Sequence, residues 1–297
     1  MASERPPTID PVAAERWERA APAASPWLHE EVARRMEDRL QWIKRAPTAW
    51  ADWEPVRGGL EAHAAIAQRY PQAKAYVVEP LRLEAARAAL AKPWWKRLGG
   101  GSAPEFGPVP DGAVQMLWSN MQLHMAAEPQ ALIAQWHQAL EVDGFLMFSG
   151  LGPDTLRELR ALYAGLGWPP PAHEFTDMHD WGDMLVASGF AEPVMDMERI
   201  TLGFATPERL LAELRELGAN LHPARFAALR GKAWKKELER ALDQRLRGPD
   251  GQLALTFEII YGHALKPLPR ARVSEQSAVS LQDMRAMLHA DKPAPRR

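Results

Sequence analysis

The sequence predicts an α/β fold built on a mainly parallel sheet, and three observations lead to this prediction. The chain has 297 residues, enough for one large core. Its 46% apolar and 25% charged residues are the balance of an ordinary globular protein. Short apolar runs alternate with segments whose apolar residues recur every three or four positions. Strands and helices in such alternation indicate crossover units, which join parallel strands.

The first half of the chain gives this alternation in order. Apolar residues from Trp27 to Ile43 recur at helical spacing, and Pro47 ends that helix. The strands expected after it are Thr48–Trp53, Ala75–Glu79, Val114–Trp118 and Gly144–Phe148. The helices expected between them are Leu60–Tyr70, Leu83–Leu90 and Leu132–Leu140. Glycine and proline content predicts a loop over Leu98–Gly112.

The second half continues the pattern and sets the domain boundaries. Helices are expected near 153–165, 177–188, 207–218 and 232–246, and strands near 193–204 and 253–264. We expect a flexible segment over 1–26 and a polar tail over 266–297. Between them we expect one domain over 27–265, with a helical insertion over about 205–248.

Composition excludes several classes of function. The net charge of −2 gives no global basic field for nucleic acid. With no cysteine, the chain has no disulfide, thiolate metal site or cysteine nucleophile, which fits a reducing compartment. No apolar run reaches the roughly 20 residues that span a bilayer, and the N-terminus lacks the apolar core of a signal peptide. We therefore expect a cytoplasmic protein, and a monomer.

Acidic residues and glycines lie at the ends of the first two expected strands, where an open α/β sheet binds ligands. Asp52 ends the first strand, Gly58 and Gly59 open the next helix, and Glu79 ends the second strand. Glu79 lies 21 residues past Gly58, close to the spacing of about 20 for a ribose-binding acid. No dinucleotide or phosphate motif is present, so a cofactor with a sugar but no phosphate, such as S-adenosylmethionine, suits the turn. The alternative is that these residues are solvated strand ends and a permissive turn.

Later segments resemble the class I S-adenosylmethionine-dependent methyltransferases, and more narrowly the malonyl-acyl-carrier-protein O-methyltransferases of biotin synthesis. The resemblance covers roughly residues 27–265. The segments that carry it are 111–124 (DGAVQMLWSNMQLH), 139–149 (ALEVDGFLMFS), 152–159 (GPDTLREL), 175–183 (FTDMHDWGD), 189–197 (GFAEPVMDM) and 257–264 (FEIIYGHA). It implies a Rossmann-like methyltransferase sandwich: a seven-stranded, mostly parallel sheet with one antiparallel strand and an inserted helical region. It also implies S-adenosylmethionine as cofactor.

The first turn departs from the pattern Asp-x-Gly-x-Gly-x-Gly of that family. Glu54 and Val56 stand at the first two glycine positions, and only Gly58 is kept. Valine restricts the backbone, and Pro55 fixes φ and removes an N–H donor. In the later loop, only Glu105 remains as an acid for the adenine amino group. The turn therefore belongs to the fold but has lost much of the surface that binds cofactor tightly.

The reaction implied by the resemblance is methyl ester formation on a malonyl thioester carried by an acidic acyl-carrier protein. A carboxylate acceptor is already nucleophilic and needs no general base, so no catalytic residue is assigned. A basic stretch, in which Arg225, Arg230, Lys235 and Lys236 lie with Lys232 and Arg240, is the candidate docking face. The alternative is a solvated helix face.

Trp118, Ser119 and Asn120 end the strand that precedes the helix near 132–140, so they are expected to line the cofactor pocket together with Asp52, Glu54, Gly58, Gly59 and Glu79. The alternative for Trp118 is core packing, and for Ser119 or Asn120 it is helix capping. His179 and Asp183 lie four residues apart near His173, but a third metal ligand is missing. We expect no metal and interpret Asp177 as a helix cap.

Two classes of function remain open. The first is an active O-methyltransferase that acts on a carboxylate, favoured by the extent of the resemblance. The second is a catalytically impaired relative that serves as a binding or regulatory protein, favoured by Glu54, Pro55 and Val56.

Overall fold

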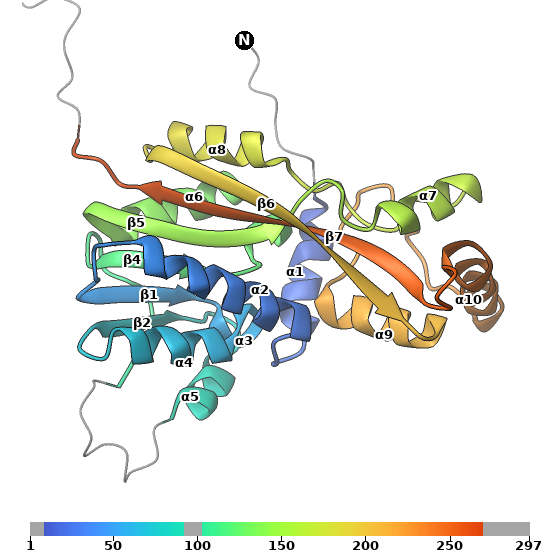
Figure 1. Ribbon diagram of the computed structural model, residues 1–297, viewed down its shortest axis with the longest axis horizontal. Coiled ribbons are helices and arrows are strands. Elements are labelled where there is room, and N and C mark those ends of the chain that lie inside the picture. Colours follow the sequence, from blue (N-terminus) through green and yellow to red (C-terminus); the bar gives the residue numbers. More distant parts are fainter. Residues whose placement is uncertain (1–8, 92–102, 270–297) are drawn as a thin grey trace, which may run out of the picture. The chain divides into compact units, whose positions relative to one another are not determined.

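The computed structural model describes residues 9–91 and 103–269, and the part that ends at Pro267 forms one compact unit (Figure 1). A seven-stranded sheet has the order β3-β2-β1-β4-β5-β7-β6. The strands are β1 (Ala49–Trp53), β2 (Lys74–Val78), β3 (Glu105–Phe106), β4 (Val114–Ser119), β5 (Leu140–Leu151), β6 (Ala191–Phe204) and β7 (Leu253–Leu265). Strand β7 runs antiparallel to both β5 and β6, and every other pair is parallel. The predicted fold class is confirmed.

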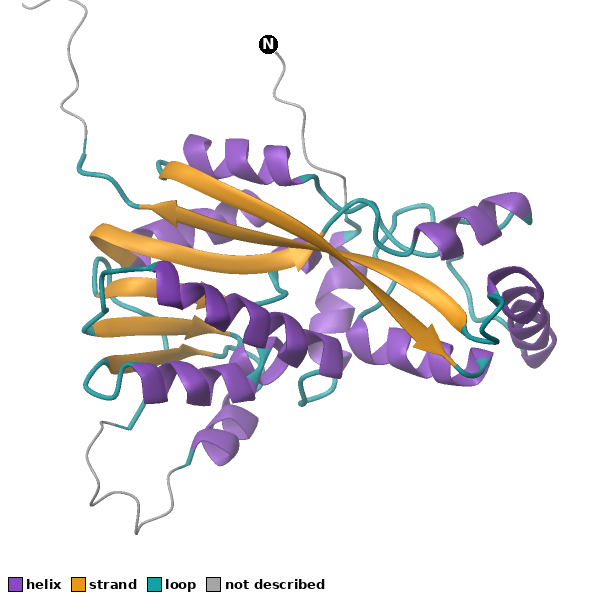
Figure 2. Ribbon diagram, viewed as in Figure 1, coloured by secondary structure: helices purple, strands orange, loops and turns teal. Residues whose placement is uncertain are grey.

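Helices cover both faces of the sheet (Figure 2). The helices before β5 are α1 (Pro11–Ala20), α2 (Trp27–Arg39), α3 (Pro55–Gly58), α4 (Leu60–Arg69), α5 (Leu83–Leu90) and α6 (Pro129–Ala139), with single turns η1 (Leu40–Trp42) and η3 (Leu123–Met125). The later helices are α7 (Arg157–Gly165), α8 (Met178–Ala187), α9 (Pro207–Leu217) and α10 (Lys232–Leu246). Helices α2 and α4 share a core with one face, and α6 and α8 share a core with the other.

Side-chain alternation along the strands decides which residues enter which core. Trp50 and Trp118 point to the α2/α4 core, whereas Ala51 and Leu117 point to the α6/α8 core. Successive residues of a strand face opposite sides of a sheet. Alternation therefore decides which of the two cores is entered by the side chain of a residue near the end of a strand.

Residues 9–26, the described part of the stretch expected to be flexible over 1–26, contain the helix α1. Asp10 accepts hydrogen bonds from the amides of Val12 (2.9 Å) and Ala13 (3.2 Å), and Pro11 occupies the first helical position, so α1 begins there. Ile9 and Ala14 are buried against Leu221. These helix-start residues, Asp10 and Pro11, could be seen in the sequence but lie in a stretch rich in alanine and proline.

The helices α7, α9 and α10 lie around the far part of β6 and β7, beyond the carboxyl ends of the parallel strands (Figure 1). Leu210 and Leu242 are fully buried there with Phe257 of β7. Because β6 and β7 pair over most of their length, this region is an extension of the central sheet.

Apart from α1, the elements differ from the expected boundaries mainly in two places. The two-residue strand β3 was not predicted, and β5 begins at Leu140 rather than at Gly144. The expected loop over 98–112 lies partly outside the described residues, as does most of the tail over 266–297. Among the described residues, no helix is long and apolar enough to cross a membrane.

Candidate functional site

The chain leaves β1 through a short helix in place of an open glycine turn. Glu54 has left-handed dihedrals (φ 56°, ψ 53°), and Pro55 starts α3. At Gly59 the φ of +131° favours glycine, and an added Cβ would lie 3.1 Å from Ala33 Cβ. The carboxylate of Glu30 then accepts from the first amides of α4, at 3.0 Å from the amide nitrogen of Leu60. The turn is held by side chains.

Asp52 does not reach the edge of the sheet, contrary to the prediction that it borders a cofactor. Its side chain points to the α4 face, where His63 Nδ1 donates to Asp52 Oδ2 at 2.8 Å. Burial raises the pKa of Asp52, and the hydrogen bond from His63 opposes that shift. The strand continues to Trp53, so alternation turns Asp52 inward. Asp52 joins β1 to α4.

Glu79 does follow β2, but its carboxylate is buried under other groups. Oε2 accepts from the Val56 amide at 3.2 Å, and Arg82 Nη1 lies 3.9 Å from Oε1. Burial raises the pKa of Glu79, which the Val56 amide and Arg82 oppose. Arg82 also donates to the carbonyl of Glu18 in α1. Arg82 thus covers the acid that was expected to face a ribose.

Trp118, Ser119 and Asn120 are all buried, and Asn120 has a structural role. Its Nδ2 donates to the carbonyls of His29 (2.9 Å) and Gly58, and its Oδ1 accepts from the Ser149 hydroxyl at 2.6 Å. Trp118 packs in the α2/α4 core. These bonds hold α2, α3 and β5 together at one point. The alternative of core packing holds for Trp118, and none of the three residues lines the cavity described next.

A cavity of about 310 Å³, hereafter the polar cavity, lies at the carboxyl ends of β1 and β4. Its polar lining comes from Glu18, His29, Glu54, Arg57, Arg82, Gln122, Glu128 and Gln135. Of the predicted cofactor residues only Glu54 lines it; Asp52, Gly58, Gly59 and Glu79 do not. The predicted position of a cavity at the ends of the strands holds, but side chains form its wall where backbone and ribose acid were expected.

Two arginines, Arg57 and Arg82, give the polar cavity its positive charge. Arg57 donates to the carbonyls of Ala24 (2.8 Å) and Glu216 (2.6 Å), and no carboxylate of the described residues lies within 4.0 Å of it. Burial, together with the charge of Arg82, lowers the pKa of Arg57 to about 10, so it stays protonated at pH 7. Burial, with the charge of Glu79, raises the pKa of Glu54 to about 7. Side chains of both signs of charge therefore line the cavity.

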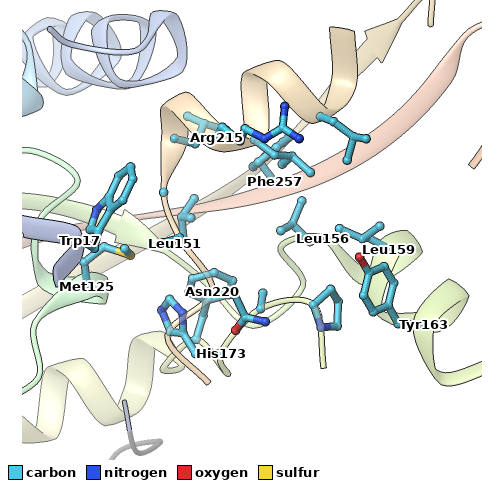
Figure 3. Close-up of a pocket in the computed structure, with 18 of the residues that line it drawn as sticks. Trp17, Met125, Leu151, Leu156, Leu159, Tyr163, His173, Arg215, Asn220 and Phe257 are labelled. Atoms are coloured by element: carbon cyan, nitrogen blue, oxygen red, sulfur yellow. The ribbon is translucent and has the colours of Figure 1, made fainter. Parts of the chain in front are cut away.

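A second cavity, of about 580 Å³ and hereafter the apolar cavity, adjoins the first. Leucines and aromatic rings line it, among them Leu159 and Tyr163 of α7 and Phe257 of β7 (Figure 3). Trp17, Met125 and Leu217 line both cavities. Burial lowers the pKa of His124 and of His173, which also line it, so both imidazoles are neutral at pH 7.

The proposed basic docking residues do not form one free face. Arg225 is paired with Asp10 at 2.6 Å, and Lys235 is paired with Glu239 at 3.3 Å while it lines the apolar cavity. Arg230 lies among aromatic rings. Lys236 is exposed, as are Lys232 and Arg240 one helical turn to either side of it on α10. Only these three match an exposed stripe.

The residues considered for a metal have local roles. Asp177 accepts from the His179 amide at 2.8 Å and so caps α8, as the alternative interpretation held. His173 Nε2 donates to the His124 carbonyl at 3.0 Å. In the part of the chain that the structure describes, no group of three or more metal-ligating side chains could hold an ion.

Sequence reasoning missed Arg57 and Arg82 as cavity residues. The sequence indicated both residues: Arg57 stands inside a turn where the family pattern is rich in glycine, and Arg82 follows the acid Glu79 by three positions. The structure shows that both side chains line the polar cavity.

Comparison with known proteins places the chain among methyltransferases. No model of a known protein family matches it. A malonyl-[acyl-carrier protein] O-methyltransferase of Gallionella capsiferriformans is 38% identical over 266 residues, covering 83% of this chain and 87% of that protein. Proteins of the same name from Laribacter hongkongensis (39%, covering 82% and 84%) and Legionella pneumophila (31%, covering 82% and 85%) are also similar.

Solved structures agree on the fold. The YcgJ protein of Bacillus subtilis superposes with a TM-score of 0.51 at 12% identity, covering 80% of this chain and 99% of that one. A protein of Bacillus halodurans, solved as a candidate methyltransferase, gives a TM-score of 0.51 at 15% identity and covers 78% and 98%. At such identities the likeness concerns architecture alone.

Proposed function

The chain belongs to the family of malonyl-[acyl-carrier protein] O-methyltransferases, and on that basis we propose that it methylates the free carboxylate of a malonyl thioester on an acyl-carrier protein. The methyl donor would be S-adenosylmethionine, which supplies a methyl group activated on a sulfonium. The observation that carries this proposal is the pair of adjoining cavities, one polar and one apolar, that share Trp17, Met125 and Leu217.

The polar cavity fits the charged end of the donor. A methionine group carries one ammonium and one carboxylate, and the cavity offers Glu54 for the first and Arg57 or Arg82 for the second. Arg82 Nε and Gln122 Nε2 are buried and have no hydrogen-bond partner among the described residues. Because unpaired buried donors are costly, a polar ligand that paired them would be stabilised. The volume of the polar cavity, about 310 Å³, lies at the lower end of the range of roughly 300–1,000 Å³ found for small-molecule sites.

The apolar cavity fits the acceptor side. A carboxylate that enters it loses water, which makes it a stronger nucleophile without a base. The neutral histidines His124 and His173 add no charge that would compete with the donor. Positioning of the carboxylate beside the shared wall at Trp17 and Met125 would then supply much of the rate.

One observation favours the second candidate, a relative that binds without catalysis. Arg82 lies beside the carboxylate of Glu79 and donates a hydrogen bond to the carbonyl of Glu18 in α1. Helix α1 forms one wall of the polar cavity. If this arrangement is rigid, a ribose cannot reach Glu79. The first candidate requires Arg82 to move aside when the donor binds.

The deciding experiment is methyl transfer to carrier-bound thioesters. Purified protein is mixed with labelled S-adenosylmethionine and either malonyl-carrier or acetyl-carrier, and base-labile methyl ester on the carrier is counted. We expect label on the malonyl form only, since the acetyl form has no free carboxylate. Label on neither form, in a protein that still binds the malonyl-carrier, would support the non-catalytic relative.

We propose that the exposed cations on α10 meet the acidic carrier, with Lys236 as their centre and with Arg225, Arg230 and Lys235 nearby. Lys236→Glu should weaken carrier binding at low salt, because it reverses a charge that steers association. Arg16→Glu, on α1, is the matched control. Equal weakening by both substitutions would show a general charge effect instead. We also propose that the protein is a cytoplasmic monomer that does not bind nucleic acid and that it acts in biotin synthesis.

A further inference from the structure

Arg230 lies in a cage of aromatic rings just before α10. Its guanidinium carbon is 3.9 Å from the ring centroid of Trp234, 4.5 Å from that of Phe226 and 5.9 Å from that of Trp168. Such contacts attract a cation and fix its plane. They do not use its N–H groups. Arg230 Nη1 is buried and has no hydrogen-bond partner, and no carboxylate lies within 4.0 Å, among residues 9–91 and 103–269.

The start of α10 adds to the positive potential at Arg230. Gly231 is the N-cap, no side chain caps the first amides, and the first turn contains no acidic residue. Lys232 follows directly. The N-terminus of a helix carries partial positive charge and free N–H groups, which favour anions. An oriented arginine with an unpaired donor beside it indicates an anion.

A small cavity of about 240 Å³ connects this place to the apolar cavity. Arg230 and Phe226 line it, and Tyr163, Pro171, Asn220 and Trp234 line both. In Figure 3, Tyr163 lies on the opposite side of the apolar cavity from Trp17 and Met125. The three cavities therefore follow one another, with the polar cavity and Arg230 at opposite ends of the apolar one.

We propose that Arg230 binds the phosphate of the phosphopantetheine arm that carries the thioester, a proposal that rests on the proposed function. The reacting carboxylate has to lie at the Trp17 end, beside the polar cavity. An anion held at the opposite end is therefore a different group of the same ligand. The arm is neutral apart from its phosphate, which suits the apolar cavity between. A guanidinium is planar and presents its N–H groups as a fork, which suits recognition of a phosphate, and the three rings orient the guanidinium of Arg230.

The test measures binding of phosphopantetheine and of pantetheine by calorimetry, to the full-length protein and to Arg230→Gln. We expect the wild type to prefer the phosphorylated compound by about tenfold, and Arg230→Gln to lose that preference while it still binds pantetheine. Arg230→Lys should keep part of it. Arg245→Gln, an exposed cation on α10 outside the proposed docking stripe, is the matched control and should behave as the wild type.

Two outcomes would overturn the proposal. One is equal binding of both compounds by the wild type, or a preference that survives in Arg230→Gln. The other is that Arg230→Gln instead removes a preference for malonyl-pantetheine over acetyl-pantetheine, which would assign the carboxylate to Arg230. Because no S-adenosylmethionine is present, the outcome does not depend on whether the protein transfers methyl groups.

Discussion

The two large cavities at the carboxyl end of the sheet are built by opposite means. The apolar cavity is shaped by leucines and aromatic rings on helices and a strand that the sequence predicts from apolar spacing alone. Charged side chains, among them Glu54, Arg57 and Arg82, line the polar cavity in and beside the turn where the family pattern offers glycine backbone. One end thus has a form given by packing, and we propose that at the other end side-chain charge replaces backbone recognition of the donor.

The substitution with the largest expected effect is Asn120→Ala, which tests whether the wall of the polar cavity is fixed. It would remove the hydrogen bonds that Asn120 makes to the Ser149 hydroxyl and to the carbonyls of His29 and Gly58. We expect a loss of about 2–4 kcal/mol in the free energy of unfolding, measured by urea denaturation.

The control for Asn120→Ala is Gln138→Ala, because the Gln138 amide makes only an exposed hydrogen bond to Asp111. It should change stability by less than about 0.5 kcal/mol. If Asn120→Ala were no worse than this control, the hydrogen bonds at the end of β4 would not hold the site together.

The next effect concerns the apolar cavity alone. Leu214→Trp places a large ring among the residues that line it, so binding of a pantetheine thioester should weaken by about tenfold or more. Binding of S-adenosylhomocysteine should not change. Val186→Trp, on the exposed side of α8, controls for the added ring. Equal loss of both ligands in Leu214→Trp would show that the cavities are one site.

The smallest effect is a dependence of stability on pH at Glu54. Its pKa is raised from 4.5 to about 7, so the neutral form favours folding; that contribution is present below about pH 4.5 and is lost as the pH rises through 7. Glu54→Gln should therefore be more stable than the wild type by about 1–2 kcal/mol at pH 8, after allowance for partial exposure. The gain should shrink to a small part of this at pH 5. A gain that is the same at both values would mean that Glu54 does not titrate as described.

Much of this fold could be predicted because packing repeats a period. Apolar runs such as Ala75–Val78 place strands in the sheet, and the helical faces of Leu210 and Leu238 place α9 against β6 and α10 against β7. The strand β3 escaped because two residues have no period. Helix α1 escaped because its start signals, Asp10 and Pro11, lay in a stretch rich in alanine and proline.

The site could be predicted in position but not in its residues. Spacing identified the ends of β1 and β2, yet it does not tell which way a side chain turns: Asp52 faces His63 inside the molecule. The polar cavity depends on Arg57 and Arg82, whose long side chains reach partners distant in sequence, Glu216 and Glu18. Such contacts have no local pattern. They form only after the chain has folded.

Calorimetry with S-adenosylhomocysteine tests the central claim most directly, namely that side-chain charge in the polar cavity has replaced backbone recognition of the donor. We predict binding by the wild type at pH 8, and about tenfold weaker binding by Glu54→Gln, although that variant is the more stable protein. No binding by the wild type at millimolar ligand, or equal binding by both proteins, would contradict it.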